Sequence, residues 1–399
     1  MKNLQQIPKE IQKVTDVTNR SQAQMQSNLP YSKDEVVVEI EELRKQVESA
    51  PLPEVLKDKA LKMVLRLKRM AKFGSYSGEY ELIEKYVSWI IALPWGKYTQ
   101  DNLDLQNARD ILDNKHYGLA SVKERILEFL AVAKLNPFDN IRTLQGEDIR
   151  DSKNTSQHAP ILCFVGIQGI GKTSMAKSIA QALGRKFIRI SLGAMGNVSD
   201  LKGQSRAYLD AEPGQVIKAL VRTKVYNPLI LLDEVDKVSS AEGRRADINA
   251  ALLEILDPEQ NTSFIDSYID YPIDLSRILF ICTANTLSTL SAALLDRLEI
   301  IRFPSYSDEE KENIAKHYLL PKVLEACGLK TEQVEIAESV WPLVIRPLGF
   351  DAGVRQLERN ITTICRKIAR KIIEGQGQKF VINVENFREY LPADIGVYS

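Results

Sequence analysis

The sequence of 399 residues predicts an α/β protein built around a parallel sheet with helices on both faces. Between residues 161 and 303, short apolar segments of strand length alternate with helical patterns. These apolar segments are continuous, which is typical of parallel strands buried on both faces. Helical patterns dominate before and after this stretch, so we expect a helical segment before the sheet and a small, mainly helical unit after it.

The chain begins with residues 1–34, which are polar and expected to be disordered. Residues 35–135 are predicted to be helical, because apolar residues recur at intervals of three or four in two stretches separated by Pro51 and Pro53. They are Val36, Ile40, Leu43 and Val47, then Leu56, Ala60, Met63, Leu67 and Met70. The two helices form either a hairpin or a covering layer on the next domain, and the pattern favours neither. Further helices are expected over 81–93 and 104–135, the latter broken at 116–118.

Residues 136–307 carry the predicted sheet, after a polar stretch (136–160) that is expected to be a surface loop. The expected strands are 161–165, 187–191, 229–233, 278–283 and 300–303. The expected helices begin at residue 172 and cover 213–224 and 246–256. In the last segment, residues 308–399, we expect helices over 308–326, 335–345 and 351–374, and one strand over 380–384.

The string GIQGIGKT, residues 166–173, directly follows a predicted strand and opens a predicted helix. This spacing and context are those of a phosphate-binding loop. The glycines allow backbone N–H groups to surround phosphate oxygens, Lys172 reaches the β- and γ-phosphates, and the Thr173 hydroxyl ligates Mg²⁺. The predicted cofactors are therefore ATP and Mg²⁺. The loop residues expected to contact the nucleotide are Gly166, Ile167, Gln168, Gly169, Ile170, Gly171, Lys172, Thr173 and Ser174.

Polar residues follow two further predicted strands. LILLDEVD places Asp233 at the end of a buried strand, where its carboxylate can hold Mg²⁺. Glu234 can polarise an attacking water, which predicts hydrolysis rather than nucleotide binding alone. Asn285 follows the strand in ILFICTAN and can hydrogen-bond the same water or the γ-phosphate.

These motifs and several longer strings resemble the ATPase module of the Lon family of ATP-dependent proteases, a branch of the AAA+ superfamily. The resembling stretch runs from about residue 36 to 391 and includes IALPWGKYTQDNLDL, HYGLASVKERILEFLAV, NPLILLDEVDK, ALLEILDPEQN and AGVRQLER. The resemblance implies an AAA+ P-loop domain with a parallel sheet flanked by helices, preceded by a helical segment and followed by a helical lid. It also implies a ring, most often a hexamer, of identical subunits.

The resemblance further implies roles for single residues. Asn285 matches the family's sensor 1, and Arg297 matches the arginine finger that reaches the γ-phosphate of a neighbouring subunit. From the residues alone, Arg297 would be read as a surface partner of Asp296 or Glu299. Arg355 matches sensor 2, which links the lid to the phosphates. His116 and Tyr117 occupy the place where the family binds adenine, although a core role for Tyr117 is nearly as well supported.

The string LKGQSRAYLDAEPGQ, residues 201–215, resembles the family's first pore loop. Tyr208 and Leu209 match the aromatic–aliphatic pair that grips an extended polypeptide. The chain departs from the family pattern here, at Gln204, Ser205, Asp210 and Glu212, and a carboxylate beside the gripping pair should alter substrate preference or weaken the grip. In the phosphate loop, Ile167 and Gln168 replace two prolines usual in the family, and we expect nucleotide binding to survive this change.

Three functions are open at this level. The first is an ATP-driven ring that unfolds or remodels polypeptides. The second is the ATPase subunit, or a truncated ATPase part, of an ATP-dependent serine protease, acting with a separate peptidase. The third is an assembly module gated by nucleotide, without threading. The chain stops at Ser399, where the family's Ser–Lys protease domain would begin, and it contains no G-x-S-x-G motif, so we expect no intrinsic peptidase activity. We also expect about 35 polar residues in place of the family's N-terminal substrate domain.

Composition excludes some classes of protein. Lys plus Arg and Asp plus Glu both number 53, so the formal net charge is zero and nucleic-acid binding is not predicted. No apolar run approaches the roughly 18 residues of a membrane-spanning helix, and the N-terminus lacks the apolar core of a signal peptide. We therefore expect a cytoplasmic protein without a membrane partner.

Overall fold

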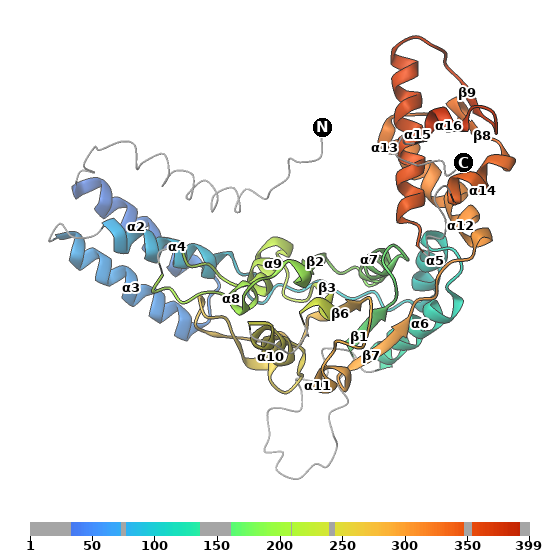
Figure 1. The fold of residues 1–399 in the computed structure, drawn as a ribbon. Coiled ribbons are helices and arrows are strands. Elements are labelled where there is room, and N and C mark those ends of the chain that lie inside the picture. Colours follow the sequence, from blue (N-terminus) through green and yellow to red (C-terminus); the bar gives the residue numbers. More distant parts are fainter. Residues whose placement is uncertain are drawn as a thin grey trace.

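The computed structural model describes residues 33–72, 77–135, 161–208, 210–238, 244–346 and 353–391. Its centre is a five-stranded parallel sheet (Figure 1) with the strand order β2-β3-β6-β1-β7. The strands are β1 (Ile161–Val165), β2 (Phe187–Ser191), β3 (Leu229–Asp233), β6 (Leu279–Ala284) and β7 (Leu298–Arg302). Three predicted strands have the expected bounds, and the other two are displaced by one or two residues. The α/β prediction is confirmed.

Side chains alternate between the two faces of the sheet, and both faces are buried. In β1, Leu162 and Phe164 belong to one hydrophobic cluster, whereas Cys163 and Val165 belong to the other. The helices that share the cluster of Leu162 are α5 (Leu105–Lys115), α6 (Ala120–Leu135) and α7 (Lys172–Ala182). Those that share the cluster of Cys163 are α8 (Val198–Lys202), α9 (Gln215–Thr223) and α10 (Arg244–Leu256). Burial on both faces explains why the strands read as continuous apolar runs.

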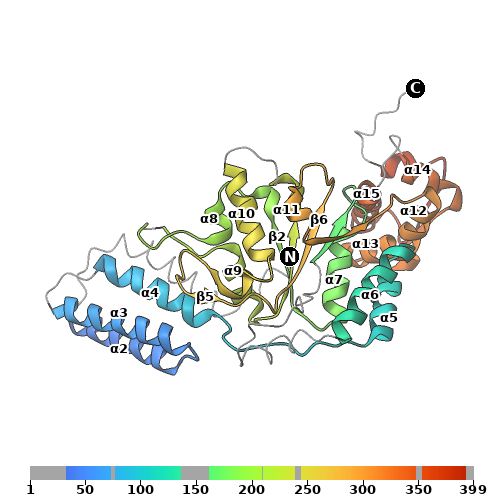
Figure 2. The same cartoon turned by 90° about the horizontal axis from the view of Figure 1, so that it is seen from below.

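The N-terminal helices form a bundle at one end of the molecule, and the C-terminal unit lies at the other end (Figures 1 and 2). Helices α2 (Lys33–Ser49) and α3 (Glu54–Lys72) pack as a hairpin, and α4 (Ser77–Ala92) packs against both. The hairpin alternative is therefore correct. The predicted stripe of α3 was incomplete, because Val64 and Ala71 are also buried. Met63 packs partly buried against the core, and Met70 is only partly buried.

The C-terminal unit is mainly helical, as predicted, with one error. Its helices are α12 (Asp308–Ile314), a π-helical turn (Ala315–Leu319), α13 (Leu320–Cys327), α14 (Trp341–Ile345), α15 (Arg355–Ile373) and α16 (Phe387–Tyr390). The helix predicted over 335–345 begins only at Trp341. Residues before it form β8 (Val334–Ile336), which pairs in parallel with β9 (Phe380–Ile382). The strand is specified by a partner more than 40 residues away, so local periodicity does not reveal it.

Smaller elements complete the described chain. They are the antiparallel pair β4 (Phe264–Ile265) and β5 (Pro272–Ile273), α11 (Ala292–Leu295), and 3₁₀ turns over Leu192–Ala194, Val235–Lys237, Asn261–Ser263, Thr331–Gln333 and Glu338–Val340. Within the described residues, no helix combines the length and apolar character needed to cross a membrane. The predictions for residues 1–32, for the loop 136–160 and for Leu209 lie outside the described residues.

Candidate active site

Three of the predicted functional segments meet at the carboxyl ends of neighbouring strands. Strand β6 lies between β1 and β3, so Gly166 after β1, Asp233 at the end of β3 and Asn285 after β6 lie at the same edge of the sheet. Ligands of open α/β sheets bind outside this edge. Topology therefore unites motifs that are about 120 residues apart in sequence.

The loop after β1 has a backbone that depends on glycine. The φ angles of Gly169 and Gly171 are 81° and 93°, in the region that other residues avoid. A Cβ atom at Gly166 would lie 2.3 Å from Ile170 Cδ1 and 2.8 Å from the Phe303 carbonyl oxygen. The chain therefore turns tightly from β1 into α7, and the N-terminus of α7 begins directly after the loop.

Lys172 connects this loop with the end of β6. Its side-chain ammonium donates to the carbonyl oxygens of Gly166 and Ile167 (3.1 Å for Ile167) and to Asn285 Oδ1 at 3.0 Å. The residue is only 9% exposed. Burial lowers the pKa of Lys172, and the nearby carboxylates of Asp233, Asp236 and Glu234 oppose that shift. A cation is thus held inside the loop, where a phosphate would bind.

The other loop residues have different environments. The side chains of Ile167, Gln168 and Thr173 are exposed, which leaves the Thr173 hydroxyl accessible to a ligand. Ile170 is buried in the core, and Ser174 Oγ donates to the Gly171 carbonyl at 2.8 Å. Together with the glycine cradle and the nearby Asp233 carboxylate, this set of donors and acceptors fits a nucleotide phosphate with Mg²⁺.

Asp233 is fixed at both carboxylate oxygens. Thr283 Oγ1 donates to Oδ1, and Nε and one terminal nitrogen of Arg189 both lie 2.6 Å from Oδ2. Asp233 and Thr283 are buried, whereas Arg189 is partly exposed. The Asp233 carboxylate is therefore held in a single orientation at the end of β3.

Glu234 adopts a left-handed backbone conformation, with φ of 62° and ψ of 47°. Its backbone N–H donates to Thr283 Oγ1 at 3.0 Å, and its Oε2 lies 2.7 Å from Lys237 Nζ. A Cβ atom at Gly193 would come within 2.5 Å of Glu234 Oε2, so glycine at that position leaves space for the carboxylate. Left-handed conformations of non-glycine residues concentrate at functional sites.

The C-terminal unit contacts the phosphate loop directly. Val354 N donates to the Gly169 carbonyl at 3.0 Å, immediately before α15. A Cβ atom at Gly169 would lie 3.0 Å from the Cβ atom of Arg355, the first residue of that helix. Tyr306 Oη donates to the Ile170 carbonyl at 3.2 Å. The structure thus brings Arg355 to the loop, in agreement with the position that the resemblance gave it.

Arg297 bonds to residues other than those gathered at the strand ends. Its guanidinium donates to Asp257 Oδ2 at 2.8 Å and to the Ala293 carbonyl at 2.7 Å. This bond to Arg297 is the main reason why the pKa of Asp257 is lowered. The interpretation that Arg297 pairs with Asp296 or Glu299 was wrong, because Arg297 pairs with Asp257. Glu299 pairs with Arg125 instead.

His116 and Tyr117 lie beside the helix that follows the phosphate loop. His116 Nε2 is 2.9 Å from Ser178 Oγ of α7, and the residue is 8% exposed. Burial, with smaller contributions from Lys123 and Lys115, lowers the pKa of His116 to about 4, so the imidazole is neutral at pH 7. Tyr117 is half-buried and packs against the core, which agrees with the core role considered as the alternative to adenine binding.

The segment that resembles a pore loop is held at its base and exposed at Tyr208. Tyr208 is 68% exposed. Asp266 Oδ2 accepts the Gly214 N–H at 2.7 Å, and Gln204 N donates to the Glu212 carbonyl at 3.1 Å. The functional roles of Tyr208 and Leu209 stay predictions.

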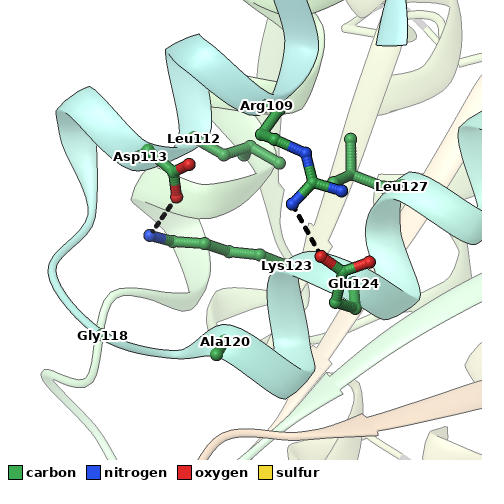
Figure 3. Close-up of a pocket in the computed structure, with 8 residues that line it drawn as sticks. All are labelled: Arg109, Leu112, Asp113, Gly118, Ala120, Lys123, Glu124 and Leu127. Carbon is green, nitrogen blue, oxygen red and sulfur yellow. Dashed lines mark hydrogen bonds and ion pairs between the residues drawn. The ribbon is translucent and has the colours of Figure 1, made fainter. Parts of the chain in front are cut away.

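A separate cavity of about 110 Å³ lies between α5 and α6 (Figure 3). Two ion pairs, Arg109–Glu124 and Lys123–Asp113, each 2.7 Å long, line it. Small-molecule pockets usually measure about 300–1,000 Å³. The size of this cavity and the pairing of its charges argue against a nucleotide site there.

Among the residues that sequence reasoning missed, Arg189, Lys237, Asp257 and Thr283 contact predicted site residues through their side chains. Thr283 carried a signal, because it is a polar residue within an otherwise apolar, buried strand. Such residues are expected to have a polar partner when buried. The identity of the partner requires the fold.

Comparisons with known proteins agree with this geometry. The model of the ATPase family associated with various cellular activities (AAA) matches residues 162–306, and the model of the Lon protease AAA+ ATPase lid domain matches residues 325–381. The C-terminal unit is therefore a Lon-type lid.

Several full-length relatives are Lon proteases. Lon protease of Dictyoglomus thermophilum is 44% identical over 364 residues, which are 91% of this chain and 43% of that protein. Lon protease 2 of Thermus thermophilus is 45% identical over 353 residues, 88% of this chain and 42% of the relative. The chain spans about two fifths of the length of the curated relatives that it matches. The chain therefore carries an AAA ATPase domain followed by a Lon-type lid, and it is similar to Lon proteases over about nine tenths of its own length.

Proposed function

We propose that this chain binds ATP with Mg²⁺, hydrolyses it, and uses the energy as a ring of identical subunits to unfold or remodel polypeptides. The observation that carries the proposal is the cluster at the strand ends, where Lys172, Asn285, Asp233 and Glu234 are held by mutual or shared contacts. The proposed domain limits are 35–135 for the helical segment, 136–307 for the ATPase domain and 308–399 for the lid.

The proposed chemistry assigns one task to each side chain. Lys172 and the loop N–H groups hold the phosphates, and Asn285 orients Lys172 and the attacking water. Glu234 polarises that water and takes up its proton, which requires that the carboxylate leave Lys237. Thr173 and Asp233 would hold Mg²⁺, which neutralises charge on the phosphate oxygens. Arg355, at the contact of lid and loop, would couple hydrolysis to lid movement.

Arg297 is proposed to act on the nucleotide bound by a neighbouring subunit, so that two subunits share each site. The Arg297 side chain is 33% exposed and is held by Asp257, which is not one of the residues gathered at the strand ends. An arginine that stabilises phosphoryl transfer from a neighbouring subunit must be presented at the surface in this way. The hexameric ring, with Tyr208 and Leu209 facing a central channel, rests on the Lon resemblance.

A second candidate is the ATPase part of an ATP-dependent protease. The observation that favours it is that the chain aligns with about two fifths of proteins that are themselves Lon proteases. In that case the same cycle would deliver unfolded chains to a peptidase, on the same or on a separate polypeptide.

The first test is ATP hydrolysis by the purified chain against subunit concentration, with and without casein, and with Lys172→Ala as background. A motor predicts a rate per subunit that rises with concentration and is increased by casein. A rate unaffected by casein, together with an oligomeric state that depends on ATP, would support the assembly module instead. Cleavage of casein that depends on ATP and on a co-purifying Ser–Lys peptidase would support the second candidate. Absence of ATP hydrolysis at every concentration would contradict the proposal.

A further inference from the structure

One buried hydroxyl contacts both acidic residues at the end of β3. Thr283, in β6, donates its proton to Asp233 Oδ1 and accepts the backbone N–H of Glu234 at 3.0 Å. The neighbouring pair Leu232–Cys282 is the last pair in the register between β3 and β6, so Thr283 lies directly beside Asp233. This single side chain therefore joins the proposed metal ligand to the proposed general base.

The Thr283 hydroxyl makes two hydrogen bonds, one donated and one accepted. A threonine hydroxyl carries one proton, and here Asp233 accepts it. One lone pair accepts the Glu234 N–H, so the rotation of the hydroxyl is set by both contacts. Thr283 is 1% exposed, and water cannot readily take its place.

The contact with Glu234 has a particular consequence because of the backbone there. Glu234 has φ of 62°, a conformation that non-glycine residues rarely adopt. Its N–H bond to Thr283 fixes that conformation at the point where the chain leaves β3. Since the side chain direction follows the backbone angles, release of the N–H would move the Glu234 carboxylate relative to the phosphate loop.

We infer that Thr283 is a positioning residue for ATP hydrolysis, which orients the carboxylates of Asp233 and Glu234 together. The inference rests on the proposed hydrolysis by these two residues. Arg189 has a lesser role, because it is partly exposed and contacts only the second oxygen of Asp233. Lys172 does not contact Thr283, so nucleotide binding should depend little on this hydroxyl.

The test compares Thr283→Val, which has nearly the same shape without the hydroxyl, with Thr283→Ser, which retains it. We expect Thr283→Val to lower kcat by about 10²-fold, because small displacements of catalytic groups have effects of this order. KM for ATP should change less than about threefold, and the Mg²⁺ concentration for half-maximal rate should rise because Asp233 loses its orientation. Thr283→Ser should remain within about threefold of the wild type in kcat.

The control is Thr223→Val, which removes a hydroxyl that donates to the Ala219 carbonyl in α9, away from the strand ends. Thermal unfolding and the stoichiometry of ATP binding are measured for every variant. A purely structural role predicts a lower melting temperature and fewer binding sites, with unchanged kcat per site and unchanged Mg²⁺ dependence. That result would overturn the inference. It would also be overturned if Thr283→Ser lowered kcat as much as Thr283→Val.

Glu234→Gln separates failure of the inference from failure of the proposed function. If the wild type hydrolyses ATP, Glu234→Gln does not, and Thr283→Val matches the wild type, only the inference is wrong. If the wild type and all variants lack hydrolysis, both are wrong. Should Thr283→Val precipitate, Thr283→Ala, which also lacks the hydroxyl, takes its place under the same criteria.

Discussion

The strand-end cluster and the loop around Tyr208 differ in how their functional side chains are held. In the cluster, Lys172, Asp233 and Thr283 are buried and have polar partners on adjacent elements. In the loop, Tyr208 is 68% exposed. The difference teaches that the polar side chains at the strand ends are preorganised by buried contacts, whereas the Tyr208 side chain is not held by the core.

The base of the loop is nevertheless rigid. Asp266 is fully buried and accepts the N–H groups of Gly214, Tyr268 and Ile269. Burial raises the pKa of Asp266, and these three bonds oppose the shift. Arg206 lies over the Tyr86 ring at 4.2 Å, which connects the loop to α4 of the N-terminal bundle. The loop thus combines a base held by buried hydrogen bonds with an exposed tip at Tyr208.

The largest expected effect comes from Arg297→Ala, which tests whether the strand-end cluster is complete within one subunit. An arginine finger contributes about 10³–10⁵-fold to phosphoryl transfer, so we expect a loss of about 10³-fold in kcat with ATP binding intact. Mixing this variant with Lys172→Ala should restore activity, because the second variant supplies Arg297 to intact sites. Arg109→Ala, which removes another ion-paired arginine, is the control. Failure of mixing to restore any activity would argue against a shared site.

The second-largest effect on ATP hydrolysis is expected from Glu234→Gln, in the strand-end cluster. The amide cannot accept the proton of the attacking water, so hydrolysis should fall by about 10²–10⁴-fold. Lys172 and the loop are unchanged, and the affinity for ATP, measured by titration calorimetry, should remain within about threefold. The matched control is Glu254→Gln, which removes a carboxylate of α10 that pairs with Lys202 of α8. Hydrolysis at the wild-type rate would show that Glu234 is not the base.

Tyr208→Ala should affect only the coupling to substrate. We expect the basal rate of ATP hydrolysis to stay unchanged and the stimulation by casein to fall several-fold. The reason is that the variant lacks the aromatic ring that would contact the bound polypeptide. Tyr208→Phe should restore the stimulation, and Ile373→Ala, at an apolar residue of the lid that is also exposed, should leave it unchanged. Unchanged stimulation in Tyr208→Ala would remove the distinction between cluster and loop.

The last prediction concerns stability rather than activity: lowering the pH should destabilise the folded protein through protonation of His116. The pKa of His116 is about 4 in the folded protein and about 6.5 in the unfolded chain. The unfolded chain therefore binds more protons between these values, and the free energy of unfolding should fall as pH drops from 6.5 to 4, by about 3 kcal/mol at most. Above pH 6.5 this contribution is constant.

The measurement is thermal unfolding without nucleotide between pH 8 and 4.5, for the wild type and for His116→Gln. The variant should show a weaker pH dependence in that window. His317→Gln, at an exposed histidine, should retain the wild-type slope. Equal slopes for all three proteins would show that His116 does not contribute.

Much of the fold was predictable, because local patterns specify local structure. The strands of the sheet were found from continuous apolar runs, and the phosphate loop from glycine spacing between a strand and a helix. The stripe predicted for α3 omitted Val64 and Ala71, which are as compatible with helical spacing as Met63 and Met70. Packing against α2 and α4 decides which of these side chains are fully buried. Large flexible methionines tolerate partial exposure at the border of such a stripe.

By itself, the sequence determined the α/β class, the order of elements, and the residues Lys172, Asp233, Glu234 and Asn285 as candidates, because motif spacing and periodicity are local properties. Only the tertiary structure decided which groups hold them: Thr283 for Asp233 and Glu234, Asp257 for Arg297, and β9 for β8. These pairs are 40 to 50 residues apart. Their contacts arise from strand order and burial, which no local pattern encodes.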